Sequence, residues 1–219
     1  MRQRQIPQED DQEMPVLPYL AVALAAYLLG SIPTGYLVAR SHRNVDILQT
    51  GSGRTGATNV LRALGWKAAL IVFLGDFGKG VAAVALARIL TNGDPLADVV
   101  AALVAMAGHN YSVFLGFRGG RGVSTGLGAL TMVTPIAALV CAIVAFSTMG
   151  ISRYVSLGSV LGALSVPFAM LVLVIVGLDP PAHLIYGVLG SAFIVLSHKD
   201  NIARLLKGTE RRLGQKART

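Results

Sequence analysis

Six apolar stretches dominate this chain and restrict it to folds that span a membrane. They cover residues 16–39, 66–90, 98–115, 123–149, 155–178 and 183–197. Each is near or above the roughly 18 to 20 residues with which a helix crosses the hydrocarbon of a bilayer, and the last is short. With 53% apolar and 14% charged residues, the chain does not read as a soluble domain carrying one anchor. One all-α, polytopic membrane domain is therefore predicted.

The charges between these stretches indicate which side of the membrane each connection faces. Three segments are net negative: 1–15 (−2), 91–98 (−2) and 178–183 (−1). Three are net positive: 40–67 (+4), 116–124 (+2) and 198–219 (+5). Positive segments stay in the cytoplasm. The N-terminus is therefore predicted outside and the C-terminus inside, which requires an odd number of crossings.

The stretch 123–149 supplies the additional crossing. It contains Gly126, Gly128 and the helix breaker Pro135, so we expect two short helices joined near residues 133–135. This interpretation predicts about seven transmembrane helices. Six helices with Arg153 outside is the alternative that the sequence leaves open.

The domain organisation follows from the same pattern. We predict a disordered N-terminal tail at 1–15, a single transmembrane domain at 16–198 and a basic cytoplasmic tail at 199–219. The net charge of +8 resides in short connections, which favours a role in topology over nucleic-acid binding. The single cysteine, Cys141, lies in an apolar stretch, and no cysteine cluster suggests a metal. Neither a cofactor nor a metal is predicted.

The first polar interruption with chemical interest is the segment 51–62. Gly51 and Gly53 allow positive φ and successive exposed N–H groups, and Ser52 adds a hydroxyl. Thr58, Asn59 and Arg62 follow within two helical turns. These groups suit a phosphate, although a Gly-Ser-Gly segment alone is usually only a flexible turn.

A second interruption, Arg118-Gly119-Gly120-Arg121-Gly122, favours phosphate binding more strongly. Two cations flank a glycine pair just before a predicted helix that starts with Ser124 and Thr125. An ordinary positive-inside loop is the competing interpretation.

Three further sets of polar residues lie near or within the apolar stretches. His109 precedes Asn110 close to the cytoplasmic side, and His198 opens a segment in which Asn201 would share its helical face, with Glu210 about three turns along. Asp76 and Lys79 are three residues apart in the second stretch, where we expect a neutralising structural pair rather than a direct catalytic role.

These segments resemble a known family. Residues 51–62, 109–125 and 198–210 look like the three signature segments of the bacterial acyl-phosphate:glycerol-3-phosphate acyltransferases, and 152–157 resembles a fourth. The similarity runs from about residue 28 to 210. It implies a seven-helix enzyme of the bacterial inner membrane with a cytoplasmic active site. The implied reaction moves a fatty acyl group from acyl phosphate to the 1-hydroxyl of glycerol 3-phosphate, giving lysophosphatidic acid.

The resemblance also implies roles for individual residues. It places Ser52, Arg62, His198 and Asn201 in the catalytic centre. Substrate-binding roles are predicted for Gly51, Gly53, Thr58, Asn59, His109, Arg118, Gly119, Gly120, Arg121, Gly122, Ser124, Thr125, Arg153, Ser156 and Glu210. The family commonly has Asn at the position of Arg54 and Lys at those of Arg118 and Arg121.

The expected partners are glycerol 3-phosphate, acyl phosphate and the lipid bilayer, with functional coupling to the enzyme that makes acyl phosphate. In the implied mechanism a substrate phosphate accepts the proton, and His198 is the alternative base. A membrane transporter or channel for a phosphorylated anion is the competing functional class, because it would have a similar set of helices.

Overall fold

The computed structural model describes residues 16–215, all of whose regular structure is helical. The elements are α1 (Val16–Ser31), α2 (Thr34–Arg43), α3 (Ala57–Leu64), α4 (Trp66–Thr91), α5 (Pro95–Asn110), the 3₁₀ turn η1 (Val113–Leu115), α6 (Val123–Val133), α7 (Pro135–Ser152), α8 (Val155–Ile175), α9 (His183–Ser197) and α10 (Lys199–Leu206). The predicted tail 1–15 lies outside the described residues.

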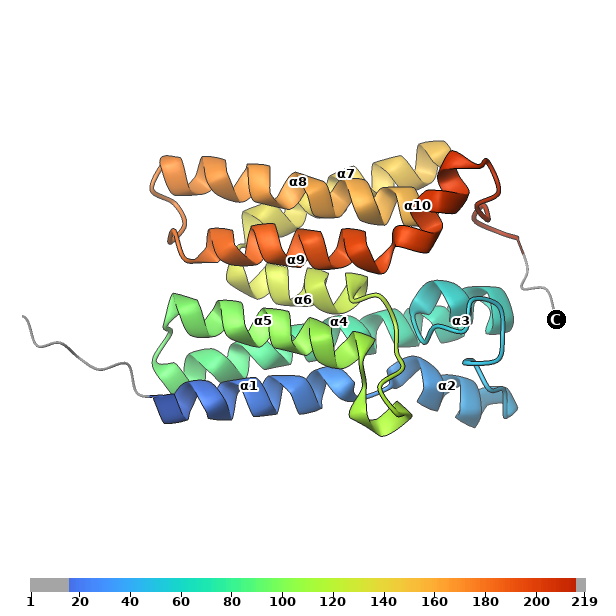
Figure 1. Ribbon diagram of the computed structural model, residues 1–219, viewed down its shortest axis with the longest axis horizontal. Helices are drawn as coiled ribbons and strands as arrows, with labels where there is room; N and C mark the ends of the chain where they lie inside the picture. Colours follow the sequence, from blue (N-terminus) through green and yellow to red (C-terminus); the bar gives the residue numbers. More distant parts are fainter. Residues whose placement is uncertain (1–15, 216–219) are drawn as a thin grey trace, which may run out of the picture.

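Within residues 16–215, seven helices run in alternating directions along the long axis of the molecule (Figure 1). They are α1, α4, α5, α6, α7, α8 and α9. The short helices α2, α3 and α10 gather at one end, together with the loop that joins α5 to α6 (Figure 1). The break expected near residues 133–135 is present, because α6 ends at Val133 and α7 begins at Pro135.

Length separates these helices into two groups. Four helical segments of the described chain are long and apolar enough to cross a membrane: 16–42, 66–91, 135–152 and 155–175. By contrast, α5 has 16 residues, α9 has 15 and α6 has 11. At 1.5 Å per residue, α6 is about half the ~30 Å thickness of the hydrocarbon. It packs between α4, α5, α7 and α9, so neighbouring helices surround it.

The first apolar stretch is broken near its middle, at Pro33, where the glycines and the proline of residues 30–35 were expected to loosen the helix. Pro33 lacks an N–H group, and α1 ends at Ser31 before α2 begins at Thr34. At this break the carbonyl of Ile32 accepts hydrogen bonds from the N–H of Thr34 and from Lys79 Nζ of α4, both at 3.0 Å. A buried lysine therefore satisfies the backbone at the break.

The third stretch is also shorter than expected. Helix α5 ends at Asn110 rather than continuing to residue 115, and the chain turns outward through η1. Ser112 and Arg118 pair across the loop, and Gly116 and Phe117 between them have positive φ. This turn directs the segment 118–122 back over the end of α5.

The bundle places small and polar residues inside and large apolar residues outside. A Cβ at Gly30 would overlap the carbonyl oxygen of Ala105, and one at Gly128 would overlap that of Phe77, so these glycines allow α1 to approach α5 and α6 to approach α4. Leu17 and Ile151 are more than three-quarters exposed, whereas Asp76 is 1% exposed. This distribution is that of a protein embedded in lipid.

Candidate active site

Asn59 organises the loop between α2 and α3. Its Nδ2 donates to the carbonyls of Thr50 and Arg54, both at 2.9 Å, and of Ile47 at 3.3 Å. Its Oδ1 accepts from the backbone N–H of Ser52 at 3.0 Å. Because Asn59 is 3% exposed on α3, it fixes the loop to a helix rather than leaving it as a flexible turn.

This loop presents the predicted hydroxyl. Gly51 and Gly53 have φ of 62° and 65°, so the chain turns sharply on either side of Ser52. The Ser52 side chain is exposed and lines a cavity, as do Thr58 and Arg62 of α3. The first predicted segment therefore comes together around one opening.

His109 explains the glycine pair of the second segment. A Cβ at Gly120 would overlap His109 Nε2, and one at Gly119 would overlap the carbonyl oxygen of His109, which also accepts from the N–H of Gly120 at 3.0 Å. His109 Nδ1 lies 3.5 Å from the carboxylate of Asp76. The glycines thus let the loop pack directly on the buried His109, near its Nε2, while the carboxylate of Asp76 lies near Nδ1, the other ring nitrogen.

The two arginines of this segment have different surroundings. Arg121 lines the cavity, whereas Arg118 is exposed and lines neither cavity of the site. Of the predicted four-residue phosphate cradle, Gly120 and Arg121 line the cavity and Arg118 and Gly119 do not, and the substrate contacts of all four stay predictions. Burial and the neighbouring Arg54 lower the pKa of Arg121 to about 10, so the guanidinium stays charged near pH 7.

The start of α6 is arranged differently from the prediction. Gly122 has φ of 80° and precedes the helix, and Ser124 lines the cavity. Thr125 faces away and is fully buried in the bundle. Thr125 thus belongs to the α4–α6 packing, where its carbonyl oxygen lies against Gly80.

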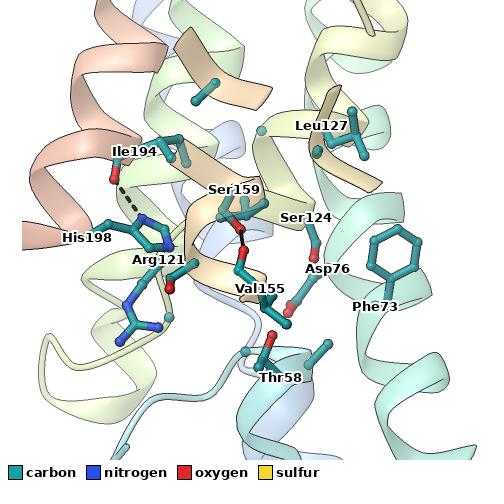
Figure 2. Close-up of a pocket in the computed structure, with 18 of the residues that line it drawn as sticks. Thr58, Phe73, Asp76, Arg121, Ser124, Leu127, Val155, Ser159, Ile194 and His198 are labelled. Carbon is teal, nitrogen blue, oxygen red and sulfur yellow. Dashed lines mark hydrogen bonds between the residues drawn. The ribbon is translucent and has the colours of Figure 1, made fainter. Parts of the chain in front are cut away.

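His198 lies at the bend between α9 and α10. Its Nδ1–H donates to the carbonyl of Ile194 at 2.8 Å, and the Arg121 guanidinium lies beside the ring (Figure 2). A carbonyl can only accept, so Nδ1 carries the proton. Burial, with a further contribution from Arg121, lowers the pKa of His198 to about 4. The ring is neutral near pH 7 and is a weak base.

Glu210 connects the third and fourth segments. Its Oε1 accepts from Ser156 at 2.8 Å and from Asn201 at 2.6 Å, and its Oε2 accepts from Arg204 Nε at 2.7 Å. Desolvation opposes ionisation, but these three donors together lower the pKa of the carboxylate. The carboxyl group is therefore a charged structural connection between α8 and α10.

This arrangement corrects two expectations. Glu210 does not continue three turns along a helix from His198: α10 ends at Leu206, Gly208 takes φ of 67°, and the chain returns toward Asn201. The segment expected as a basic tail also packs on the domain, because the N–H of Leu213 donates to the carbonyl of Arg153 at 2.7 Å. Arg153 is exposed and lines neither cavity, and its predicted contact with substrate stays a prediction.

Two cavities meet at the site. An apolar cavity of about 690 Å³ extends between α4, α6, α7, α8 and α9. A polar cavity of about 330 Å³ lies beside it and contains Arg54, Arg62, Arg121, Arg204 and Arg211 together with Asp200 and Glu210. Ser52, Arg54, Arg62, Arg121, Asn201 and Glu210 line both. Figure 2 shows Thr58, Asp76 and Ser124 around the apolar side.

Among residues 16–215, no three His, Cys, Asp or Glu side chains lie close enough together to hold a metal ion. The lining is instead suited to bind an amphiphile with an anionic head group. Guanidiniums suit phosphate, and the apolar cavity suits a hydrocarbon chain.

The family model for glycerol-3-phosphate acyltransferase matches residues 20–208. The chain belongs to this family. Glycerol-3-phosphate acyltransferase 3 of Dehalococcoides mccartyi (strain ATCC BAA-2266 / KCTC 15142 / 195) is 45% identical over 94% of this chain and 100% of its own length. A glycerol-3-phosphate acyltransferase of Clostridioides difficile (strain 630) is 44% identical over 93% of this chain and 99% of its own length.

Solved structures of a family member have the same fold. The crystal structure of PlsY, an integral membrane glycerol 3-phosphate acyltransferase, in its glycerol 3-phosphate form is 40% identical, with a TM-score of 0.81 over 90% of this chain and 96% of that chain. The lysophosphatidic acid form gives a TM-score of 0.80 over 90% and 95%.

Membership confirms the predicted family and acyltransferase class, and it decides against the anion transporter that the residues alone left open. It also makes the chain an integral membrane protein. The roles predicted for individual residues stay predictions, now with known positions.

Three arginines of the polar cavity were missed from the sequence as site residues. Arg204 is three residues after Asn201, a spacing that places both on one face of α10, so the pattern contained a signal. Arg54 follows the Gly-Ser-Gly turn directly. Arg211 reaches the cavity only because the chain returns after Gly208, for which the sequence offers no periodic signal.

Proposed function

We propose that this acyltransferase moves a fatty acyl group from acyl phosphate to the 1-hydroxyl of glycerol 3-phosphate, releasing lysophosphatidic acid and inorganic phosphate. The observation that carries the proposal is the junction of an arginine-rich polar cavity with an apolar one. The acyl chain occupies the apolar cavity, and both phosphate groups lie on the polar side. The reacting carbonyl then lies at the junction, beside Ser52, Arg62 and Arg121.

Two anionic substrates repel each other unless cations lie between them. Arg54, Arg62 and Arg121 line both cavities, and within the described residues none of them forms an ion pair with a carboxylate. They therefore retain their charge for the substrates. Acyl-CoA enzymes with the His-x4-Asp motif differ from this chain, in which no histidine is followed by aspartate five residues later.

The chemistry needs alignment more than it needs a strong base. The glycerol oxygen forms a new bond to the acyl carbon, the bond from that carbon to the phosphate oxygen breaks, and the hydroxyl proton passes to a phosphate oxygen. Ser52 and neighbouring N–H groups can stabilise the developing oxyanion. His198 is a weak base, because burial lowers its pKa to about 4, and its Nδ1–H bond to Ile194 fixes the ring, so it supports the site by position.

The donor is tested with the purified enzyme in detergent. We expect inorganic phosphate release from acyl phosphate only when glycerol 3-phosphate is present, and no transfer from acyl-CoA under matched conditions. Ser52→Ala should lower turnover by about 10² to 10³, the effect of losing one oxyanion donor. Transfer from acyl-CoA at an equal rate would show that the donor is wrongly identified.

We also propose seven crossings of the bacterial inner membrane, with the active site in the cytoplasm. The end of the bundle that contains α3 and α10 also holds the basic connections, whereas the α4–α5 and α8–α9 connections lie at the other end (Figure 1). The half-length α6 need not meet lipid, because other helices surround it.

Cysteine labelling tests this orientation. On a background without Cys141, cysteines at Thr50 and Gln215 should be shielded from an impermeant thiol reagent in intact cells, and one at Asn92 should be labelled. Labelling at Gln215 but not at Asn92 would reverse the orientation.

A further inference from the structure

Arg211 is a half-buried cation that the family resemblance does not explain. It lies in the non-helical segment after α10 and lines the polar cavity. Its Nη1 is shielded from solvent and has no hydrogen-bond partner among residues 16–215. Burying a guanidinium N–H without an acceptor is costly, so native structures rarely retain one without a reason.

The backbone holds Arg211 at this position from both sides. Glu210 precedes it with three side-chain hydrogen bonds to α8 and α10. Arg212 follows with its guanidinium carbon 5.6 Å from the centre of the Tyr154 ring, and Leu213 is bonded to the carbonyl of Arg153. These contacts fix the backbone on both sides of Arg211, so its side chain starts from a defined position at the polar cavity.

The charges around Arg211 point to an anionic ligand. Burial and then the proximity of Arg211 lower the pKa of Arg62, which places two like charges side by side in a partly buried space. Of the two carboxylates that line the polar cavity, Glu210 is bonded to Arg204 and Asp200 is exposed. Within the described residues neither forms an ion pair with Arg211.

The shape of the site indicates which anion this is. Arg54, Arg62 and Arg121 line both cavities and therefore lie near the reacting carbonyl, whereas Arg211 lines the polar cavity alone. In acyl phosphate the phosphate is attached directly to that carbonyl. In glycerol 3-phosphate the phosphate is separated from the attacking 1-hydroxyl by the whole glycerol backbone, so it lies further from the junction.

We infer that Arg211 binds the phosphate group of glycerol 3-phosphate, as a specificity-determining residue at the polar side of the site. This inference rests on the proposed function, since it uses the position of the acyl carbon at the junction. Arg211 would thereby let the enzyme distinguish the phosphorylated acceptor from free glycerol, because it contacts only the distal group of the acceptor.

The test compares Arg211→Gln with the wild-type enzyme in detergent. We expect KM for glycerol 3-phosphate to rise about 10- to 100-fold, the loss that follows removal of one charged hydrogen bond, with KM for acyl phosphate unchanged within about twofold. Titration of glycerol 3-phosphate without any donor should show the same loss of affinity. Arg211→Lys, which keeps the charge, should recover part of it.

Lys207→Gln is the matched control, because it removes one exposed positive charge close to the same segment. It should leave both KM values unchanged. A rise in KM for acyl phosphate instead of glycerol 3-phosphate, or unchanged affinity for both, would overturn the inference.

The outcomes also separate this inference from the proposed function. Unchanged glycerol 3-phosphate affinity in an Arg211→Gln enzyme that still uses acyl phosphate refutes only the role of Arg211. Failure of the wild-type enzyme to use acyl phosphate refutes only the donor, since binding of glycerol 3-phosphate is measured without it.

Discussion

Replacing Asn59 by Ala should release the loop that presents Ser52 while leaving the bundle folded. The substitution removes an amide whose two N–H groups are shared among three carbonyls and whose oxygen accepts one bond, all with backbone groups between residues 47 and 54. At about 0.5–1.5 kcal/mol for each net hydrogen bond, and counting the three shortest, the loop loses roughly 2–4 kcal/mol. Of loop residues 44–56, Ile47 and Thr55 alone are buried, so most of the loss is expected to be local.

Hydrogen exchange measures this loss directly. A loss of about 2–4 kcal/mol corresponds to exchange faster by roughly 30- to 1,000-fold in a peptide covering residues 47–56, with little change in peptides from α8 or α9. Activity should fall in parallel, because Ser52 is no longer held at the cavity junction. Asn59→Asp should be at least as damaging, since it loses both N–H donors and places a negative charge beside the three backbone carbonyls that accepted from them.

Gln49→Ala is the control within the same loop, because its exposed side chain bonds only to Asp46. It should leave exchange and activity nearly unchanged. If Asn59→Ala abolished activity while exchange of residues 47–56 stayed at the wild-type rate, Asn59 would act on substrate itself, and the structural interpretation would be refuted.

Three further predictions follow from buried contacts. Burial lowers the pKa of His198 to about 4, whereas a histidine in the unfolded chain titrates near 6.5. Between these pH values the unfolded chain binds a proton that the folded chain does not, so the stability of the fold falls as the pH drops from about 6.5 to about 4. His198→Gln should remove this part of the pH dependence in unfolding experiments and leave the rate profile between about pH 6 and 8 unchanged; loss of an ionisation near 6.5 from that profile would restore the histidine as general base. Asp76→Asn leaves the ammonium of Lys79, 2.9 Å away, without its carboxylate and should lower the free energy of unfolding by about 3–5 kcal/mol. In thermal unfolding, the double variant Asp76→Asn/Lys79→Met should recover part of this loss. A normally stable but inactive Asp76→Asn would instead indicate a role in the reaction. Gly120→Ala should raise KM for glycerol 3-phosphate by pushing the loop off His109, and adding His109→Ala should restore part of the affinity by making room for the new methyl group; no restoration would mean that the clash is not the cause.

Much of the membrane architecture was predictable from local pattern. Apolar length identified the helices, and Pro135 located the break between α6 and α7, because a proline cannot continue the preceding helix. The boundaries of the third stretch were less predictable. Apolar composition continues to residue 115, but the chain leaves the helix at Asn110 and turns through Gly116 and Phe117 with positive φ.

The site residues likewise divide into those whose position the sequence predicted and those whose position it did not. Residue type predicted Ser52, Arg62 and Arg121 as phosphate ligands, because hydroxyl and guanidinium groups beside glycine turns are chemically suited to anions, and all three line both cavities. The same pattern also selected Arg118 and Arg153, which are equally basic but exposed and outside both cavities. Charge and spacing do not reveal on which side of a loop a side chain emerges.

The sequence by itself therefore determined that this chain is an all-helical membrane acyltransferase, because hydrophobic length and the motif residues are local properties of the chain. Only the tertiary structure decided which polar groups meet. Asn59 fixes a loop that begins twelve residues earlier, and Glu210 joins Ser156 across 54 residues. The approach of Arg211 to Arg62 likewise depends on the return of the chain after Gly208. Such contacts arise from packing between distant segments, which no local period in the sequence encodes.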